Sequence, residues 1–245
     1  MRHRTLTAAG FPAAGTIFDV SSFRLEVRDG PHPWLTGNEA GIAANWEREI
    51  ALNPRLFNGR MVFQRDLVLD DGHIRGAAHL VPYAAFLHWR RFGRGGGDGY
   101  HLFAMPLILS RDGAVMAIRM ADTTANPGRV YPPAGSLDDS DVHDGLCDLD
   151  GNMMRETREE TGLDLGAMAA EPAYRAVHSA DTVAIFRIFR SPLCEGELVA
   201  RASAHIAVES EPEISAMFGI RSADPEAHDY PPFMPPVLDW IFRKG

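Results

Sequence analysis

The chain has 245 residues, which suits one large domain or a domain with a smaller appended unit. Its 45% hydrophobic and 23% charged residues are typical of a globular protein, and its net charge of −9 argues against a nucleic-acid partner, which needs a basic surface. Two cysteines are too few for a disulfide framework and favour a cytoplasmic location. No membrane span and no signal peptide are predicted, because no apolar run is long enough.

The first hundred residues predict a mixture of strands and helices. In chain order these are a strand or hairpin arm at 16–28, a helix at 38–52 with Asn38 as its N-cap, strands at 60–69 and 72–81, and a short helix at 82–91. The sequence Asp70-Asp71-Gly72 predicts the turn between the two strands.

Five glycines among residues 93–99 predict a loop or a domain boundary. A phosphate-binding loop is the alternative, but the Gly-Lys-Ser/Thr ending of such loops is missing. The elements predicted after it are strands at 102–109 and 114–120, a helix at 149–161, strands at 181–190 and 198–208, and a closing helix at 235–243. Strands around one central helix predict an α/β or α+β sandwich.

The predicted helix at 149–161 carries a set of carboxylates on one face. Glu156, Glu159 and Glu160 are three or four residues apart, so their side chains point the same way and repel one another. Mg²⁺ would remove the repulsion, because this hard cation prefers carboxylate oxygens and completes its shell with water and phosphate oxygens. Arg155 stands four residues before Glu159 and could hold that carboxylate. On spacing alone, a solvated acidic face is the commoner interpretation of such a run.

The other features of this segment predict a helix with a buried side and a defined end. Leu149, Met153 and Thr157 repeat every four residues and should face the core. Gly162 stands where a left-handed C-cap is needed.

Residues 155–163, Arg-Glu-Thr-Arg-Glu-Glu-Thr-Gly-Leu, resemble the core of the Nudix box, Arg-Glu-apolar-x-Glu-Glu-x-Gly-apolar. Every charged and glycine position matches, and Thr157 stands at an apolar one. The resemblance implies an α/β/α sandwich with a mixed sheet, here carrying a smaller N-terminal α/β extension. It also implies that Glu156, Glu159 and Glu160 bind Mg²⁺, with Mn²⁺ as a substitute.

The upstream half of the box departs from the family pattern, which has a glycine, five residues, and then a Glu that stands eight before the Arg. Cys147 occupies that place here, with Asp148 beside it, and the matching glycine, Gly135, lies twenty residues before Arg155 instead of fourteen. We infer an insertion of about six residues within 136–150, whose acids are expected to form a solvated loop. The resemblance further implies that the carbonyl of Ala134 contacts the metal.

The Nudix family usually has one more Glu on a later loop, acting as a base or as a further ligand. Glu209, Glu211 and Glu213 are the candidates here, and spacing does not choose among them. We rank Glu211 and Glu209 above Glu213 and expect at least two of the three to be surface acids. Glu160 and this loop glutamate are the expected catalytic residues.

The remaining candidates carry weaker signals. No HExxH pair is present, so zinc is not expected, and His178 and His205 should hydrogen-bond locally. Cys147 is a weak nucleophile candidate, because the sequence displays no Cys–His arrangement. The aromatic residues 57, 83, 86 and 89 are expected in the core, although one could stack on a nucleobase.

The segment Trp46–Phe63 resembles the N-terminal region of the UDP-glucose/UDP-galactose pyrophosphatase branch of the Nudix family, which also has an elongated box. This implies hydrolysis of a UDP-sugar to UMP and sugar 1-phosphate, with residues 1–99 selecting the substrate and 100–245 forming the Nudix domain. The branch has an eroded box, whereas this chain keeps all the helix carboxylates. The alternatives are a pyrophosphatase for ADP-ribose or a dinucleotide, and a non-catalytic ligand-binding module, against which the intact carboxylate set argues.

Overall fold

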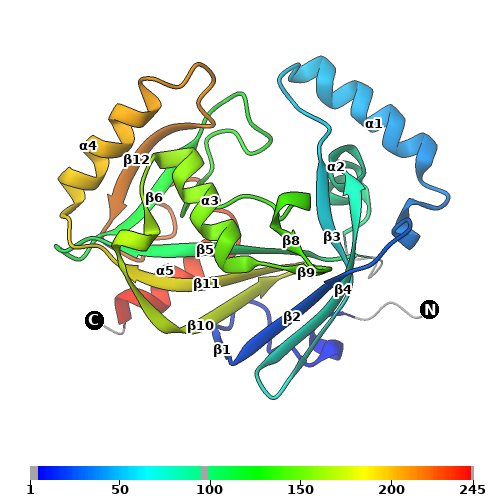
Figure 1. The fold of residues 1–245 in the computed structure, drawn as a ribbon, viewed down its shortest axis with the longest axis horizontal. Coiled ribbons are helices and arrows are strands. Elements are labelled where there is room, and N and C mark those ends of the chain that lie inside the picture. Colours follow the sequence, from blue (N-terminus) through cyan, green and yellow to red (C-terminus); the bar gives the residue numbers. More distant parts are fainter. Residues whose placement is uncertain (1–4, 95–98, 244–245) are drawn as a thin grey trace.

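The computed structural model describes residues 5–94 and 99–243, which form two β-sheets with helices around them (Figure 1). The larger sheet has the strand order β1-β10-β11-β5-β6-β12, with β7 beside β6. Its strands are β1 (Phe18–Val20), β5 (His101–Leu109), β6 (Val115–Met120), β7 (Val130–Tyr131), β10 (Ala169–Ser179), β11 (Thr182–Arg190) and β12 (Ile214–Ile220). The β11–β5 pair is parallel and the other pairs are antiparallel, so this sheet is mixed.

The smaller sheet has the strand order β3-β4-β2-β9-β8. Its strands are β2 (Ser22–Val27), β3 (Arg60–Asp70), β4 (His73–Pro82), β8 (Val142–His143) and β9 (Leu146–Cys147). Strands β2 and β4 run parallel, so this sheet is mixed as well. The hairpin β8–β9 comes from the stretch in which the sequence predicted an insertion, and it joins the sheet through a pair between Leu146 and Glu26.

Helices lie on both sides of the larger sheet, which confirms the predicted α/β/α sandwich (Figure 1). Helix α3 packs on β5 and against α4, while Trp240 of α5 meets Phe186 of β11 with ring centroids 5.6 Å apart. The helices are α1 (Glu39–Leu52), α2 (Tyr83–Phe92), α3 (Leu149–Thr161), α4 (Glu195–Ile206) and α5 (Met234–Arg243). No helix in the described ranges is both long and apolar enough to cross a membrane.

Most predicted elements are confirmed. The arm at 16–28 is β1 and β2, the pair at 60–69 and 72–81 is β3 and β4, and the predicted helices are α1, α2, α3 and α5. At the turn, Asp71 and Gly72 have φ of 47° and 77°, left-handed values that Asp tolerates and Gly adopts freely. The predicted hairpin of β5 and β6 also forms, although the two strands pair only at Leu109 and Val115.

One predicted strand is wrong, because residues 198–208 lie mostly in helix α4. The helix starts at a capping box in which the Glu197 carboxylate accepts the backbone N–H of Cys194. Leu198 and Ala202, four residues apart, are its buried side chains, which is the period of a helix. Asn38 stands at the N-cap position of α1, but its side chain donates to the carbonyl of Trp34 instead of capping the helix.

The two predicted parts of the chain share sheets and core. Strand β1 pairs with β10, and β2 pairs with β9, so residues before and after the glycine cluster lie in the same sheets. Leu25 and Ile74 from the N-terminal part belong to the same buried cluster as Leu107. Residues 95–98, with three of the glycines of the predicted boundary, lie outside the described residues.

Candidate metal-binding and catalytic site

Helix α3 begins and ends where the sequence provides caps. The Asp148 carboxylate accepts the N–H of Gly151 at 2.9 Å and closes the first turn. Gly162 ends the helix at φ 68°, which confirms the predicted left-handed C-cap. The ring of His205 from α4 packs so closely that a Cβ at Gly162 would lie 2.9 Å from it, so this position requires glycine for space as well as for conformation.

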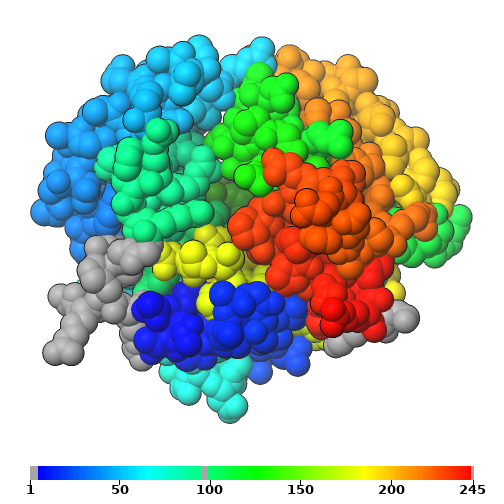
Figure 2. Space-filling view, turned by 180° about the vertical axis from the view of Figure 1, so that it is seen from behind, coloured from blue at the N-terminus to red at the C-terminus, as the bar shows by residue number. Residues whose placement is uncertain are grey.

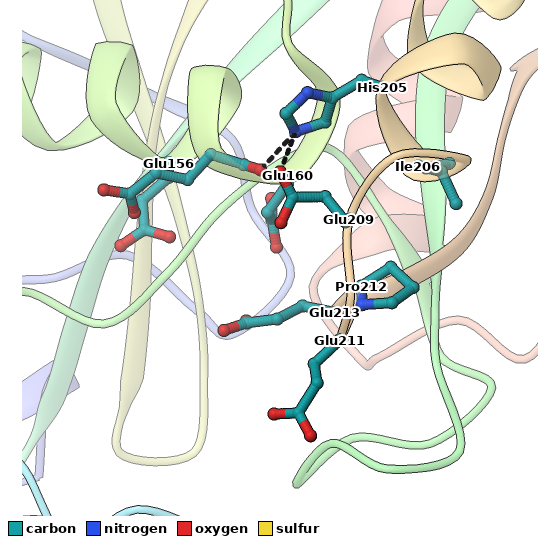
Figure 3. Close-up of a pocket in the computed structure, with 9 residues that line it drawn as sticks. Glu156, Glu160, His205, Ile206, Glu209, Glu211, Pro212 and Glu213 are labelled. Atoms are coloured by element: carbon teal, nitrogen blue, oxygen red, sulfur yellow. Dashed lines mark hydrogen bonds and ion pairs between the residues drawn. The ribbon is translucent and has the colours of Figure 1, made fainter.

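The buried side of α3 is the predicted one. Leu149, Met153 and Thr157 are fully buried against the core. This orientation turns Glu156, Glu159 and Glu160 toward a pocket of about 480 Å³. Glu209, Glu211 and Glu213 line the same pocket, so the structure brings together all six glutamates that the sequence indicated (Figure 3).

The three helix glutamates differ in depth. Glu160 is 7% exposed, and its carboxylate accepts the backbone N–H of Ala134 at 3.0 Å. Glu156 lies against Gly135, where an added Cβ would come within 2.1 Å of the carboxyl carbon, so only glycine leaves room for it. Glu159 is exposed at the edge of the pocket. The loop at Ala134 and Gly135 is therefore shaped around the helix carboxylates.

Burial and repulsion between carboxylates disfavour the charged forms of Glu156 and Glu160 when no cation is near. Burial raises the pKa of Glu156 to about 7, although the charge of Arg155 opposes this rise. Burial, reinforced by the charges of Glu156 and Glu213, raises the pKa of Glu160 well above its usual value. A divalent cation would offset both effects, because it supplies the positive charge that the pocket lacks.

The oxygen-only donor set fits Mg²⁺ or Mn²⁺. Within residues 5–94 and 99–243, no three acidic, His or Cys side chains already stand in a ligand cluster, so binding would require the carboxylates to move closer together. The N–H of Ala134 is already used by Glu160, and the role of its carbonyl stays a prediction.

Arg155 joins the helix carboxylates to the segment that follows Gly135. Its guanidinium contacts Glu159 at 2.9 Å and Glu156 at 2.8 Å, which agrees with the predicted support of Glu159. On its other side it binds Asp141 at 2.8 Å and lies 3.6 Å from Asp138. Arg155 therefore sits between four carboxylates and fixes the positions of two that face the pocket.

The expectation of a solvated acidic loop is wrong for Asp141, which is 3% exposed. Cys147 stands eight residues before Arg155, the place where the family pattern predicts a Glu. Counting five intervening residues forward from Gly135 reaches Asp141, the carboxylate that binds Arg155 in the structure. The additional residues thus follow this carboxylate and form the hairpin β8–β9, while Cys147 is buried with a pKa raised to about 12 by burial.

The three loop glutamates have different surroundings. Glu209 lies 3.8 Å from His205, and Glu211 is 69% exposed and 4.0 Å from Arg55. Glu213 directly precedes β12, its carbonyl accepts the N–H of Ala121 at 2.9 Å, and its side chain extends toward α3 (Figure 3). Glu213 is exposed as a whole residue, but partial burial of its carboxyl, and then the charge of Glu159, raises the pKa of Glu213, so this carboxyl lies within the electrostatic field of the helix glutamates.

A second, larger cavity of about 970 Å³ adjoins the same carboxylates. One end is formed by Glu156, Glu159, Glu160 and Glu213, and the other by aromatic and arginine side chains of α2 and β5. Of the aromatics considered from sequence, Tyr83 and Phe86 line this cavity, Trp89 is buried in a separate cluster, and Phe57 is 83% exposed. Arg90, Arg94 and His101 carried no sequence signal, because the segments that hold them are distant from the box along the chain.

No protein-family model and no curated protein matches the chain. Among solved structures, it is similar to a MutT protein from Methanosarcina mazei Go1, with 17% identity over 59% of this chain and 94% of that one and a TM-score of 0.36. It is also similar to the Nudix hydrolase RenU from M. smegmatis, with 11% identity, 62% and 91% coverage and a TM-score of 0.39. The NUDIX domain of Shewanella oneidensis NrtR, complexed with ADP ribose, gives 12% identity, 59% and 87% coverage and a TM-score of 0.39.

Proposed function

We propose that this protein is a Nudix pyrophosphohydrolase that uses Mg²⁺, or Mn²⁺, to hydrolyse a nucleoside diphosphate linked to another moiety. The observation that carries the proposal is the convergence of Glu156, Glu159 and Glu160 on one pocket, from a helix whose sequence resembles the Nudix box. A solvated acidic face would not need Glu160 buried or Glu156 seated against a glycine.

The helix glutamates are the proposed metal ligands, with the carbonyl of Ala134 as a further one. A bound divalent ion would supply positive charge to the diphosphate oxygens. Arg155 holds Glu156 and Glu159 through ion pairs at 2.8 and 2.9 Å, which reduces the reorganisation needed for metal binding. The helix glutamates and Ala134 therefore place oxygen atoms around the proposed metal position, and Arg155 keeps two of the carboxylates there.

Hydrolysis needs a base for the attacking water, and we assign this role to Glu213 ahead of Glu209 and Glu211. Its raised pKa and its direction toward α3 support the choice, because a base must reach the water that attacks phosphorus. Water donates its proton to the base, a new oxygen–phosphorus bond forms, and the bridging phosphorus–oxygen bond breaks. The products are a nucleoside monophosphate and the phosphorylated second half.

A UDP-hexose is the proposed substrate, giving UMP and hexose 1-phosphate. The resemblance of Trp46–Phe63 to the UDP-sugar branch and the lengthened box support it. The position of Tyr83, Phe86 and Arg90 in the larger cavity supports a contribution of the N-terminal part to substrate selection. Because every diphosphate makes similar central contacts, selectivity must come from the two ends of the substrate.

The test is a comparison of kcat/KM for UDP-glucose, UDP-galactose, ADP-ribose and NADH, with and without Mg²⁺ and with chromatography of the products. We expect hydrolysis that depends on Mg²⁺ and prefers the UDP-sugars. Preference for an adenine nucleotide would overturn the UDP-sugar assignment, and absence of hydrolysis for every diphosphate with either metal would overturn the enzymatic proposal.

A further inference from the structure

The end of the larger cavity that lies away from the carboxylates has a chemistry of its own. We call it the aromatic chamber, and it is lined by Phe86, Arg90, Arg94, His101 and Phe103. Helix α2 and strand β5 supply most of this lining, from the two sides of the segment left undescribed. Figure 2 shows the molecular surface hollowed between α2, drawn in teal, and the orange-red segment that precedes α5.

The rings of the chamber form a continuous row. His101 lies 4.7 Å from Phe86 and 5.2 Å from Phe103, measured between ring centroids, and is stacked on Phe103 at 25°. Phe233, from the segment before α5, extends the row at 5.1 Å from Phe103. Such a row presents apolar faces to a planar ring while leaving its edge free for hydrogen bonds.

The polar groups of the chamber are mainly donors. Arg90 uses part of its guanidinium to hold the carbonyl of Ala125 and the amide oxygen of Asn126, at 3.1 and 3.0 Å. Arg94, at the exposed rim, lies over the ring of Trp89 at 5.7 Å. Arg94 donates to the hydroxyl of Thr182 at 3.4 Å, and burial and the charge of Arg90 lower its pKa while the charge of Asp181 opposes this. Each guanidinium has five N–H groups, so some of them remain available to donate hydrogen bonds to a ligand.

His101 adds a buried polar atom that needs a partner. Burial, and then the charges of Arg94 and Arg90, lower its pKa to about 3, so its ring is neutral at physiological pH. Its Nε2 atom is buried and has no hydrogen-bond partner among the described residues. An unsatisfied buried nitrogen costs stability, and a ligand edge can supply the missing hydrogen bond.

A line of polar groups connects the chamber to the carboxylates. Asn126 contacts both Arg90 and, at 3.4 Å, the hydroxyl of Tyr131. Tyr131 in turn lies close enough to Glu160 for that charge to help burial raise the pKa of the phenol. A ligand with its phosphates at the carboxylate end can therefore extend into the chamber without leaving the cavity. The volume of this cavity is typical of sites that bind small molecules.

We propose that the aromatic chamber is a nucleobase subsite that selects bases with carbonyl oxygens at the edge, such as uracil, over bases with amino groups there. The inference rests on the proposed function for the position of the phosphates. Arginine donates hydrogen bonds and accepts none, so it pairs with the O4 atom of uracil and leaves the 4-amino group of cytosine unpaired. The same reasoning favours hypoxanthine over adenine.

The experiment measures binding of UMP, CMP, IMP and AMP by calorimetry without catalysis, since none of these ligands contains a diphosphate. We expect UMP to bind at least about tenfold more tightly than CMP, and IMP more tightly than AMP. Arg94→Gln should remove most of this preference. Arg91→Gln is the matched control, because Arg91 lies three residues before Arg94, is exposed and pairs with Glu49 at 3.6 Å outside the cavity.

A second variant, His101→Phe, keeps the ring and removes the buried nitrogen, and it should weaken UMP binding, whereas the control Arg91→Gln should leave UMP binding within about twofold. Equal affinities for UMP and CMP, or a preference that survives in both chamber variants, would overturn the subsite even if diphosphates are hydrolysed. A preference that depends on Arg94, in a protein that hydrolyses no diphosphate, would support the subsite and overturn the proposed function alone.

Discussion

The guanidinium of Arg155 binds the carboxylate of Asp141 at two points, with Nη2–Oδ2 at 2.8 Å and Nε–Oδ1 at 3.2 Å. Asp141 also accepts hydrogen bonds from the Asn152 amide at 2.9 Å and from the backbone N–H of Asp138 at 3.0 Å. A two-point pair restricts the guanidinium plane as well as its position. Arg155 is thereby held in the orientation in which it contacts Glu156 and Glu159.

Replacement of Asp141 should therefore affect both stability and turnover. Asp141→Asn removes one partner of a buried ion pair, and we expect the free energy of unfolding to fall by about 2–4 kcal/mol. The matched control is Asp139→Asn, since Asp139 is 56% exposed and lies 3.9 Å from Arg60, and this change should cost less than about 0.5 kcal/mol. Urea unfolding of both variants measures the difference, and equal costs would show that Asp141 has no special structural role.

Glu160→Gln should separate metal binding from folding. The buried carboxylate is repelled by Glu156 and Glu213, so its neutral replacement should leave the melting temperature without Mg²⁺ unchanged or higher. Turnover in Mg²⁺ should fall by about 100-fold or more. The control is Asp164→Asn, an exposed change outside the pocket. Wild-type turnover of Glu160→Gln at every Mg²⁺ concentration would remove Glu160 from the site.

The loop glutamates should be distinguished by a series of single Gln variants. We expect Glu213→Gln to lower kcat by about 10²–10⁴-fold with little change in KM, because a base acts only during the chemical step. Glu209→Gln and Glu211→Gln should retain most activity, since one lies beside His205 and the other near Arg55. A large loss of kcat at Glu209 or Glu211, with Glu213→Gln active, would transfer the role of base.

Acid should destabilise the protein through His32. Burial lowers the pKa of this fully buried imidazole to about 4, whereas the unfolded chain binds its proton near pH 6.5. The unfolded state therefore holds more protons between these values, and the free energy of unfolding falls as pH decreases from about 6.5 to 4, by about 3 kcal/mol.

The variant that checks this prediction is His32→Asn, which can still accept the N–H of Trp34, as the His32 ring does at 3.1 Å. Thermal melts from pH 7.5 to 4 should have a smaller pH dependence in His32→Asn than in the wild type. Identical slopes would mean that another group carries the acid sensitivity.

The sequence alone was sufficient for α3, because everything that defines this helix lies within fifteen residues. Asp148 and Gly162 provide local hydrogen bonds and a left-handed end, and the four-residue repeat of Leu149, Met153 and Thr157 selects the buried side. Once that side faces the core, the glutamates must face the pocket. The strand predicted at 198–208 was wrong because a short apolar run is compatible with either a strand or a helix. The capping box that identifies this segment as a helix lies before the run.

Contacts between residues that are distant along the chain could not be predicted from the sequence. Gly135 and Arg155 could be matched to one motif, but only the fold identifies Asp141 as the carboxylate between them. The residues added after Asp141 form the hairpin β8–β9, which pairs with β2. Which loop glutamate points at α3 depends on where β12 enters the larger sheet beside β6. The aromatic chamber needs α2 placed against β5, and such long-range contacts depend on packing rather than on the local periodicity that determines a helix.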